Sequence, residues 1–213
     1  DSSNLIPLSM VSIERMWAVI SATKYVVENN IEGDLVECGV WKGGNLILYN
    51  QLNKKKNLNR KIYGYDTFEG MSTPSRFDFK DNTSSQSYIN NLYNQKTNSK
   101  SGWSKSTIDE VKENILTESS LENINLIKGK VEDTLLNNNN VPEKISILRL
   151  DTDFYESTKM ELEVLFPRLE KNGILIIDDY GFKYGARKAV DEYFKKKPFL
   201  IYVDHDCRLL IKN

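Results

Sequence analysis

Four aspartates directly follow two short apolar segments in the C-terminal half of the chain. Asp151 and Asp153 follow the first segment, which ends at Leu150, and the second segment ends in the pair Asp178 and Asp179. Short apolar runs bounded by polar residues are typical of buried strands in a parallel sheet. Carboxylates at neighbouring strand ends would repel one another, and a divalent cation bound by their oxygens would relieve that repulsion. The pattern therefore predicts a divalent-cation site.

The same aspartates have structural interpretations that need no ligand. Asp151 could form an Asx-turn, and Asp153 could cap a helix expected over residues 156–170. The adjacent acids Asp178 and Asp179 have a weaker structural interpretation, because two acids at a strand end add little stability. Metal binding needs three or more oxygens directed at one point, which two neighbouring strand ends can supply.

A glycine-rich turn in the N-terminal half defines a second group of candidate residues. The turn Gly39-Val-Trp-Lys-Gly-Gly44 follows an expected strand that contains Glu37. It has neither the Gly-Lys-Ser/Thr of a phosphate loop nor the GxGxxG order of a dinucleotide site. Asp66 ends the next expected strand, 22 residues after Gly44, where an acid can accept hydrogen bonds from ribose hydroxyls. The glycines could serve only a tight connection and Asp66 only a turn cap, but together they favour an adenosine-containing cofactor.

Apolar periodicity places both groups in one doubly wound α/β sheet. A helix is expected over 12–29, with Ser12 as N-cap and an apolar face formed by Ile13, Met16, Trp17, Ile20 and Val27. Strands are expected over 34–38, 61–65, 124–128, 145–150 and 174–177, with two closing strands over 199–203 and 208–212. Five β/α units and a closing hairpin form such a sheet. Its ligands bind beyond the carboxyl ends of the strands, where the acids named above would share one rim.

The expected domain organisation is a single domain over residues 1–213. An N-terminal helical segment covers 1–32, and a long polar loop over 72–106 is expected to serve as a lid or substrate loop. Ser106-Thr-Ile-Asp109 predicts a capping box at the start of a helix. Pro167 is expected to end or kink the last turn of the helix over 156–170.

Composition and residue usage exclude several classes of function. The 213 residues have a formal net charge of −1, which favours neither nucleic acid nor a membrane surface as partner. No apolar run has the length of a membrane span and no export signal opens the chain, so a cytoplasmic location is expected. Cys38, within an apolar segment, is expected to be a buried thiol. His205 is the single histidine, so neither a nucleophilic triad nor a Cys/His zinc site is supported.

Several motifs of the chain, in order from about Met10 to the C-terminus, resemble the macrocin O-methyltransferase family. These motifs are residues 34–44, Tyr65-Asp-Thr-Phe-Glu-Gly70, residues 148–158, Ile176-Ile-Asp-Asp-Tyr-Gly181 and residues 185–194. The resemblance implies the class I methyltransferase (Rossmann-like) fold, mostly parallel with a C-terminal antiparallel hairpin. It also implies an enzyme that uses S-adenosyl-L-methionine and Mg²⁺ to methylate a sugar hydroxyl of a natural product, nucleotide sugar or surface glycan.

The resemblance further implies roles for individual residues. Cofactor binding is implied for Glu37, Gly39, Val40, Trp41, Gly43, Asp66, Thr67, Glu132, Asp133 and Asp151. Mg²⁺ binding is implied for Asp151, Asp178 and Asp179, with Asp153 as the general base. A metal chelated by two sugar hydroxyls would lower their pKa, and the base would take the proton during methyl transfer. The resemblance also favours a homo-oligomer, with the N-terminal helix and the long loop as candidate contacts.

Three other classes of protein compete with this interpretation. A metal-dependent glycosyltransferase could use Asp151-Thr-Asp153 as an Asp-x-Asp motif, but the glycine turn paired with Asp66 and the closing hairpin disfavour it. A nicotinamide-dependent dehydrogenase lacks its GxGxxG motif here and does not require four rim aspartates. A non-catalytic S-adenosylmethionine-binding module is disfavoured by the presence of an acid at every expected position.

Overall fold

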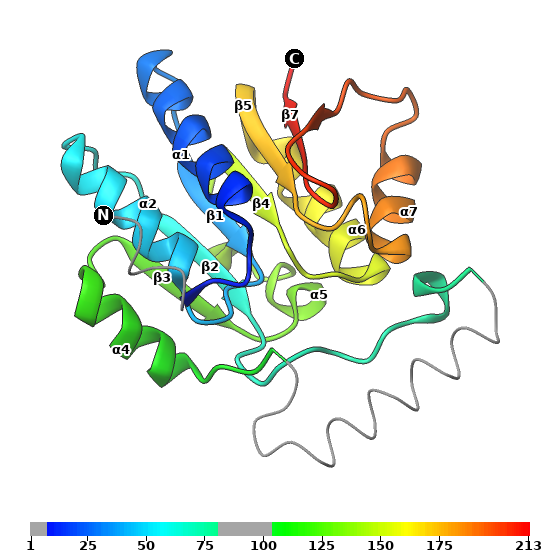
Figure 1. The fold of residues 1–213 in the computed structure, drawn as a ribbon, viewed down its shortest axis with the longest axis horizontal. Helices are drawn as coiled ribbons and strands as arrows, with labels where there is room; N and C mark the ends of the chain where they lie inside the picture. Colours follow the sequence, from blue (N-terminus) through cyan, green and yellow to red (C-terminus); the bar gives the residue numbers. More distant parts are fainter. Residues whose placement is uncertain (1–7, 81–103) are drawn as a thin grey trace.

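The computed structural model describes residues 8–80 and 104–213. These residues fold around a single seven-stranded sheet (Figure 1). The strand order is β3-β2-β1-β4-β5-β7-β6. Strands β1 to β5 are parallel, and β7 pairs antiparallel with both β5 and β6. The strands are β1 (Asp34–Cys38), β2 (Ile62–Asp66), β3 (Ile124–Lys128), β4 (Ile145–Leu150), β5 (Leu169–Ile177), β6 (Ile201–Tyr202) and β7 (Arg208–Ile211). The predicted doubly wound sheet, mostly parallel with antiparallel C-terminal strands, is confirmed.

Helices cover both faces of this sheet (Figure 1). One face carries α1 (Ile13–Glu28), α2 (Gly44–Lys55) and α4 (Ile108–Glu118). The other face carries α5 (Val131–Thr134), α6 (Tyr155–Val164) and α7 (Tyr184–Tyr193). Three short 3₁₀ turns complete the described elements: η2 (Arg76–Asp78), η3 (Asn138–Asn140) and η4 (Phe166–Arg168). Within the described ranges, no helix combines the length and apolar character needed to cross a membrane.

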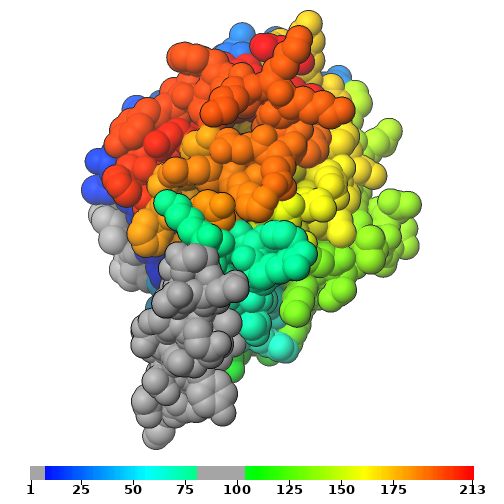
Figure 2. Space-filling model, turned by 90° about the vertical axis from the view of Figure 1, so that its right-hand side faces the viewer, coloured from blue at the N-terminus to red at the C-terminus, as the bar shows by residue number. Residues whose placement is uncertain are grey.

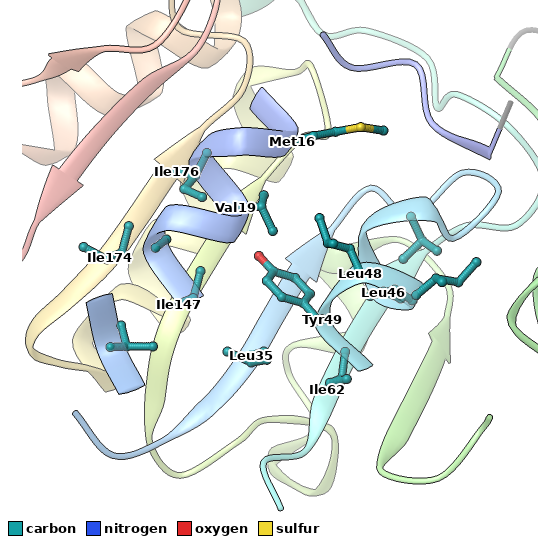
Figure 3. Close-up of a cluster of buried hydrophobic side chains, with 14 of the residues drawn as sticks. Met16, Val19, Leu35, Leu46, Leu48, Tyr49, Ile62, Ile147, Ile174 and Ile176 are labelled. Carbon is teal, nitrogen blue, oxygen red and sulfur yellow. The ribbon is translucent and has the colours of Figure 1, made fainter. Parts of the chain in front are cut away.

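The central strands are buried on both faces because helices lie on each side of them. Alternate residues of β1 and β4 divide between two apolar clusters: Leu35 and Ile147 face α1 and α2, whereas Val36 and Leu148 face α6 and α7. Figure 3 shows the first cluster, where Tyr49 of α2 packs among the aliphatic side chains. This packing on both faces holds the sheet in place, and with it the carboxyl ends of β1 and β4.

Helix α1 lies where it was predicted, with the Ser12 hydroxyl accepting from the Arg15 amide. Its buried face agrees with the predicted one at Met16, and Ile20 and Val27 pack partly against the core, but the rest of the face differs. Ile13 is 70% exposed and Trp17 is 60% exposed. The buried face consists of Met16, Ala18, Val19, Ala22, Thr23 and Val26. Small residues such as alanine allow a helix to approach a sheet closely, and this overrides the stripe of larger apolar residues.

Several predicted boundaries move by a few residues. The capping box is formed by Thr107 and Glu110, not by Ser106 and Asp109, because Thr107 has the extended backbone of an N-cap. The helix predicted over 156–170 is α6 followed by η4, in which Pro167 lies at the first turn. The remaining residues belong to β5, which begins at Leu169. Strand β6 contains only two residues of the predicted 199–203.

Most of the predicted loop over 72–106 lies outside the described residues. Its described start runs along the surface beside α6 and α7, where the chain up to residue 80 can be followed in Figure 2. Asp78 ends η2 there, and its Oδ1 accepts a hydrogen bond from the backbone N–H of Tyr155 at 2.6 Å. This segment therefore caps the N-terminus of α6, which directly follows the loop carrying Asp151 and Asp153.

Candidate active site

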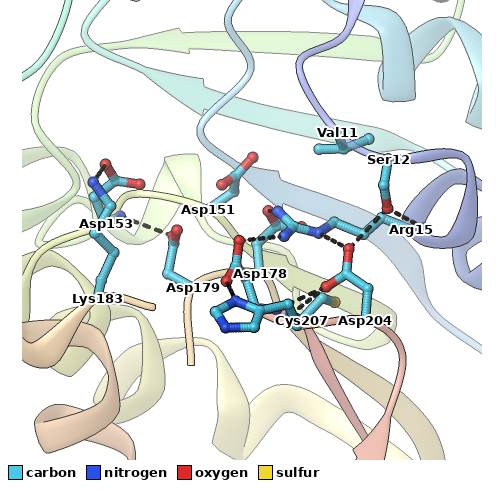
Figure 4. A network of polar contacts seen from close by, with 12 residues as sticks. Val11, Ser12, Arg15, Asp151, Asp153, Asp178, Asp179, Lys183, Asp204 and Cys207 are labelled. Atoms are coloured by element: carbon cyan, nitrogen blue, oxygen red, sulfur yellow. Dashed lines mark hydrogen bonds and ion pairs between the residues drawn. The ribbon is translucent and has the colours of Figure 1, made fainter. Parts of the chain in front are cut away.

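The four aspartates predicted at the strand ends do lie on one rim of the sheet (Figure 4). Strands β4 and β5 are parallel neighbours in register, with Leu150 paired to Ile177, so the residues that follow them emerge side by side. Among the described residues, Asp151, Asp153 and Asp179 form a group whose potential ligand oxygens all lie within 4.8 Å of one another. Three carboxylates this close are a suitable oxygen donor set for a hard divalent cation.

Asp178 lies beside this group but is bonded differently. Its Oδ1 accepts from Arg149 Nη2 at 2.6 Å, and its Oδ2 accepts from Arg15 Nη1 at 2.5 Å. Both oxygens therefore already bind guanidinium groups, one from β4 and one from α1. The structure thus groups Asp153, rather than the predicted Asp178, with Asp151 and Asp179. The role of Asp178 as a metal ligand remains a prediction.

Asp153 occupies a turn that directs its carboxylate into the cluster. Its φ of +68° lies in the left-handed region, and its Oδ2 forms an ion pair with Lys183 Nζ at 2.8 Å. Its backbone N–H donates to Asp179 Oδ2 at 3.2 Å. The alternative role as N-cap of α6 is wrong, because Phe154 is the N-cap residue and the capping oxygen comes from Asp78.

The electrostatics of the cluster favour a bound cation. Burial raises the pKa of Asp151 well above its usual range, and repulsion from the neighbouring aspartates adds to this shift although Arg149 opposes it. Burial and repulsion from Asp153 and Asp178 likewise raise the pKa of Asp179. A divalent cation would reverse both effects, since it stabilises the ionised carboxylates that repel one another without it.

The glycine-rich turn and Asp66 form the other half of the rim. Gly39 has a φ of +89°, and a Cβ atom placed there would lie 2.0 Å from the carbonyl oxygen of Asp151, so only glycine allows the two loops to touch. Asp66 Oδ2 accepts from the amides of Val40 and Trp41 at 2.8 and 2.9 Å. Asp66 therefore does fix the turn, as its structural interpretation proposed, and it also faces the adjoining cavity.

Glu37 lies beneath this turn and is 1% exposed. Its Oε1 accepts from Arg149 Nη1 at 2.6 Å and from Asn45 Nδ2 at 2.8 Å. Arg149 also binds Asp151 and Asp178, so one buried guanidinium connects the two halves of the rim. Burial opposes the charge on Arg149, but attraction to these three acids raises its pKa well above the usual value.

A cavity of about 220 Å³ opens between the two halves of the rim. Of the predicted site residues, its lining includes Gly39, Trp41, Asp66, Thr67, Glu132, Asp151 and Asp153. A smaller cavity of about 30 Å³ adjoins it and is lined by Glu37, Val40, Asn45, Arg149 and the segment 8–11, among others. Gly43, Asp133, Asp178 and Asp179 line neither of these two cavities.

Sequence reasoning missed the positive charges of the site. Arg149 carried a signal, since it interrupts an otherwise apolar strand and a buried arginine requires acidic partners. Arg15 and Lys183 carried none, because their partners are 163 and 30 residues away in sequence. Asp78 was also missed, because its bond to the start of α6 spans 77 residues.

Comparison with known proteins gives a consistent family. Residues 3–207 match the family model described as macrocin-O-methyltransferase (TylF). Demethyldecarbamoylnovobiocin O-methyltransferase of Streptomyces niveus is 30% identical over 93% of this chain and 73% of its own. A tetracenomycin-C 4'-O-methyltransferase of Streptomyces olivaceus, which acts on a dimethoxy-rhamnosyl derivative by its name, is 30% identical over 87% of this chain and 67% of its own.

A solved structure agrees with these relatives. The O-methyltransferase NovP superposes with a TM-score of 0.82 at 28% identity, over 96% of this chain and 82% of NovP. The calicheamicin methyltransferase CalS11 superposes with a TM-score of 0.66 at 19% identity, over 96% of this chain and 80% of its own, which supports the fold alone.

Proposed function

The chain belongs to the macrocin O-methyltransferase (TylF) family, and from that premise we propose that it transfers a methyl group from S-adenosyl-L-methionine to a sugar hydroxyl of a small-molecule acceptor. The observation that carries the proposal is the cavity of about 220 Å³ that joins Gly39, Asp66 and the Asp151–Asp153 loop. One wall has the glycine turn expected of a nucleoside cofactor, and the other has the acids expected of hydroxyl chemistry.

The residues present fit S-adenosyl-L-methionine. Gly39 lines the cavity, and its lack of a side chain lets the turn lie directly against the Asp151 carbonyl. Asp66 and Glu132 line the cavity at the ends of neighbouring strands, where a ribose and an adenine would be held. Buried Oε2 of Glu37, Oδ1 of Asn45 and Nε of Arg149 have no hydrogen-bond partner among the described residues. These residues line the smaller cavity, so polar groups of the cofactor's amino-acid end would find partners there.

The acid cluster fits Mg²⁺, and we assign Asp151 and Asp179 as its carboxylate ligands. These two aspartates belong both to the set predicted from the sequence and to the cluster of the structure. A bound divalent cation would supply Lewis-acid polarisation of an acceptor hydroxyl and help to orient it. Because both oxygens of Asp178 bind arginines, we assign Asp178 to hold Arg15 and Arg149 rather than the cation.

Asp153 is assigned as the general base, next to these ligands. Lys183 and the Asp179 carboxylate hold it in place through its side chain and its backbone N–H, respectively. An acceptor hydroxyl beside Asp153 would give its proton to the Asp153 carboxylate. At the same time the hydroxyl oxygen would bond to the methyl carbon of the donor. Bound S-adenosyl-L-methionine would supply the methyl group from its sulfonium and would leave as S-adenosyl-L-homocysteine, with the carbon–sulfur bonding pair retained on sulfur. Such proton transfer contributes about 10²–10⁴-fold to the rate.

The activity is tested by incubating the protein with methyl-labelled S-adenosyl-L-methionine and a panel of free sugars, glycosides and nucleotide sugars, with Mg²⁺ or with excess chelator. We expect label in at least one acceptor and loss of transfer in chelator. Calorimetric titration with S-adenosyl-L-methionine and with nucleotide sugars runs in parallel. Binding of a nucleotide sugar without binding of S-adenosyl-L-methionine would favour the glycosyltransferase alternative and overturn the proposal.

The ligand assignment is tested by comparing Asp179→Asn with Asp178→Asn. The first variant is expected to weaken Mg²⁺ binding at least about tenfold, because it removes one charged ligand. The second is expected to retain Mg²⁺ affinity and to lose stability, because it leaves two arginines without their shared partner. Equal loss of Mg²⁺ affinity in both variants would return Asp178 to the ligand set.

A further inference from the structure

The turn that carries Asp153 is strained and needs support from the surrounding protein. The Phe154 amide donates to the Thr152 carbonyl at 2.8 Å, and Asp153 between them has a φ of +68°. A hydrogen bond between residues two apart with positive φ at the centre describes a γ-turn of the rare, strained form. Such a conformation persists only where neighbouring contacts determine it, and it is common at functional sites.

Glu161 supplies one of these contacts from beneath the turn. The Thr152 hydroxyl donates to Glu161 Oε1 at 2.9 Å. Glu161 belongs to α6, has no exposed surface and lies behind the loop, whereas Thr152 also lines the large cavity. The contact therefore links a residue at the cavity wall to a helix position that no ligand in the cavity could reach.

The environment of Glu161 differs from that of the rim acids. The titratable groups that face it are Cys38 of β1 and Glu132 of α5, and no ion pair is formed by Glu161 within the described part of the chain. Burial raises the pKa of Glu161 to about 8. The side chain therefore carries a proton at neutral pH and acts there as a neutral hydrogen-bonding group. Burying such a group without a bond would be costly, and the bond from Thr152 to Oε1 offsets part of that cost, while Oε2 has no hydrogen-bond partner among the described residues.

We propose that Glu161 is a positioning residue, which holds the strained Thr152–Phe154 turn through the Thr152 hydroxyl and thereby aims the Asp153 carboxylate at the acceptor. The inference rests on the proposed function, because it assigns Asp153 as the general base. Glu161 touches neither cavity. Its effect is expected on turnover and not on cofactor affinity.

Three variants test the contact from both of its sides. Thr152→Val keeps the shape and removes the donor, Glu161→Leu removes the acceptor, and Glu161→Gln keeps a neutral acceptor of the same size. We expect kcat to fall at least tenfold in the first two and to stay within threefold of wild type in the third. The dissociation constant for S-adenosyl-L-methionine is expected to change less than twofold in the two Glu161 variants, because Glu161 lines neither cavity. Normal kcat in Thr152→Val would overturn the inference, whether or not Glu161→Leu folds.

Ser146→Ala is the matched control at the other end of β4. Its buried hydroxyl donates to the Gly33 carbonyl at 3.1 Å, so the variant removes a comparable hydrogen bond far from the rim. We expect a lower melting temperature with unchanged kcat. A fall in kcat equal to that of Thr152→Val would show that lost stability, not lost positioning, explains the effect.

Asp153→Asn separates failure of this inference from failure of the proposed function. If Asp153→Asn turns over normally, the general-base assignment fails. If Asp153→Asn is inactive while Thr152→Val and Glu161→Leu are fully active, only the positioning inference fails. A readout without turnover is hydrogen exchange at the Phe154 amide, which closes the turn. Exchange is expected to be at least tenfold faster in Thr152→Val than in wild type, and unchanged exchange counts against the inference.

Discussion

The two halves of the carboxyl-end rim both carry acids, but the protein gives those acids different partners. In the β1–β2 half, Asp66 accepts from backbone amides of two loops, and Glu37 accepts from Arg149 and Asn45. In the β4–β5 half, carboxylate oxygens of Asp151, Asp153 and Asp179 face one another. The first half is therefore organised by the protein's own donors. In the second, Arg149 and Lys183 pair with Asp151 and Asp153, yet the three carboxylates still present oxygens to one another that could hold a cation.

The adjacent residues Asp178 and Asp179 show the same difference within one strand end. Asp178 accepts from two arginines, and Asp179 points into the acid cluster. Adjacent residues direct their side chains differently, so the two aspartates meet different neighbours. Asp178 meets two guanidinium groups and fixes the structure, whereas Asp179 meets other carboxylates and can hold a cation. Substitutions in each half of the rim test this distinction.

The largest expected effect is on catalysis in the β4–β5 half. Asp153→Asn removes the proton acceptor but keeps the size of the side chain, so kcat is expected to fall about 10²–10⁴-fold. Affinity for S-adenosyl-L-methionine should be unchanged, because the β1–β2 half is intact. Single-turnover methyl transfer and calorimetry measure the two quantities. Asp109→Asn, at an exposed position of α4, is the control.

Arg149 is expected to matter for folding because it serves both halves. Arg149→Met leaves Glu37 and Asp178 buried without this partner, which is expected to cost about 3–5 kcal/mol of the free energy of unfolding. The control is Lys144→Met, whose solvent-exposed pair with Glu32 should contribute far less to stability because water and salt screen it. Urea denaturation measures both. Similar values for the two variants would refute the view that Arg149 ties the halves together.

Two glycines of the glycine-rich turn, Gly39 and Gly43, allow the cost of backbone strain to be measured separately from the cost of close contact between the halves. Gly39 and Gly43 have nearly equal φ values of +89° and +90°. A Cβ at Gly39 would lie 2.0 Å from the Asp151 carbonyl oxygen, whereas the nearest atom at Gly43 is a Val111 methyl at 3.2 Å. Gly39→Ala is therefore expected to cost about 1–3 kcal/mol more than Gly43→Ala in urea denaturation. Equal costs would mean that the two loops separate easily.

The elements of the fold could be predicted because each is determined locally. Strands β1, β3 and β4 have the predicted ends, since apolar runs between turn residues define them. The buried face of α1 could not be predicted, because Ile13 and Val19 are equally apolar and the approach of the helix to the sheet decides between them.

The acidic residues of the candidate site could be predicted from the sequence, but their hydrogen-bond and ion-pair partners could not. Position at or just after the carboxyl end of a strand placed Asp66, Asp151 and Asp179 on one rim. Their individual bonds depend on Arg15, Lys183 and Asp78, which come from distant segments. Sequence spacing carries no information on such long-range pairs, so the different partners of Asp178 and Asp179 emerged only from the structure.

The smallest expected effect is a pH dependence of stability at Glu161. Its pKa is about 8 when folded and near the ordinary 4.5 when unfolded, so between these values only the folded chain holds the proton. Wild-type stability should therefore fall as pH rises from about 4.5 to 8, relative to Glu161→Gln, which does not titrate there. A tenfold change in the acid dissociation constant between the two states corresponds to about 1.4 kcal/mol, so a difference of at least about 1 kcal/mol is expected at pH 8.

Urea denaturation at pH 5 and pH 8 measures this difference, with Glu163→Gln on the exposed side of α6 as the control that should follow wild type. If the free energy of unfolding changes with pH in the same way for wild type and Glu161→Gln, Glu161 is ionised in the folded protein. It would then resemble the rim acids, which are paired with cationic groups.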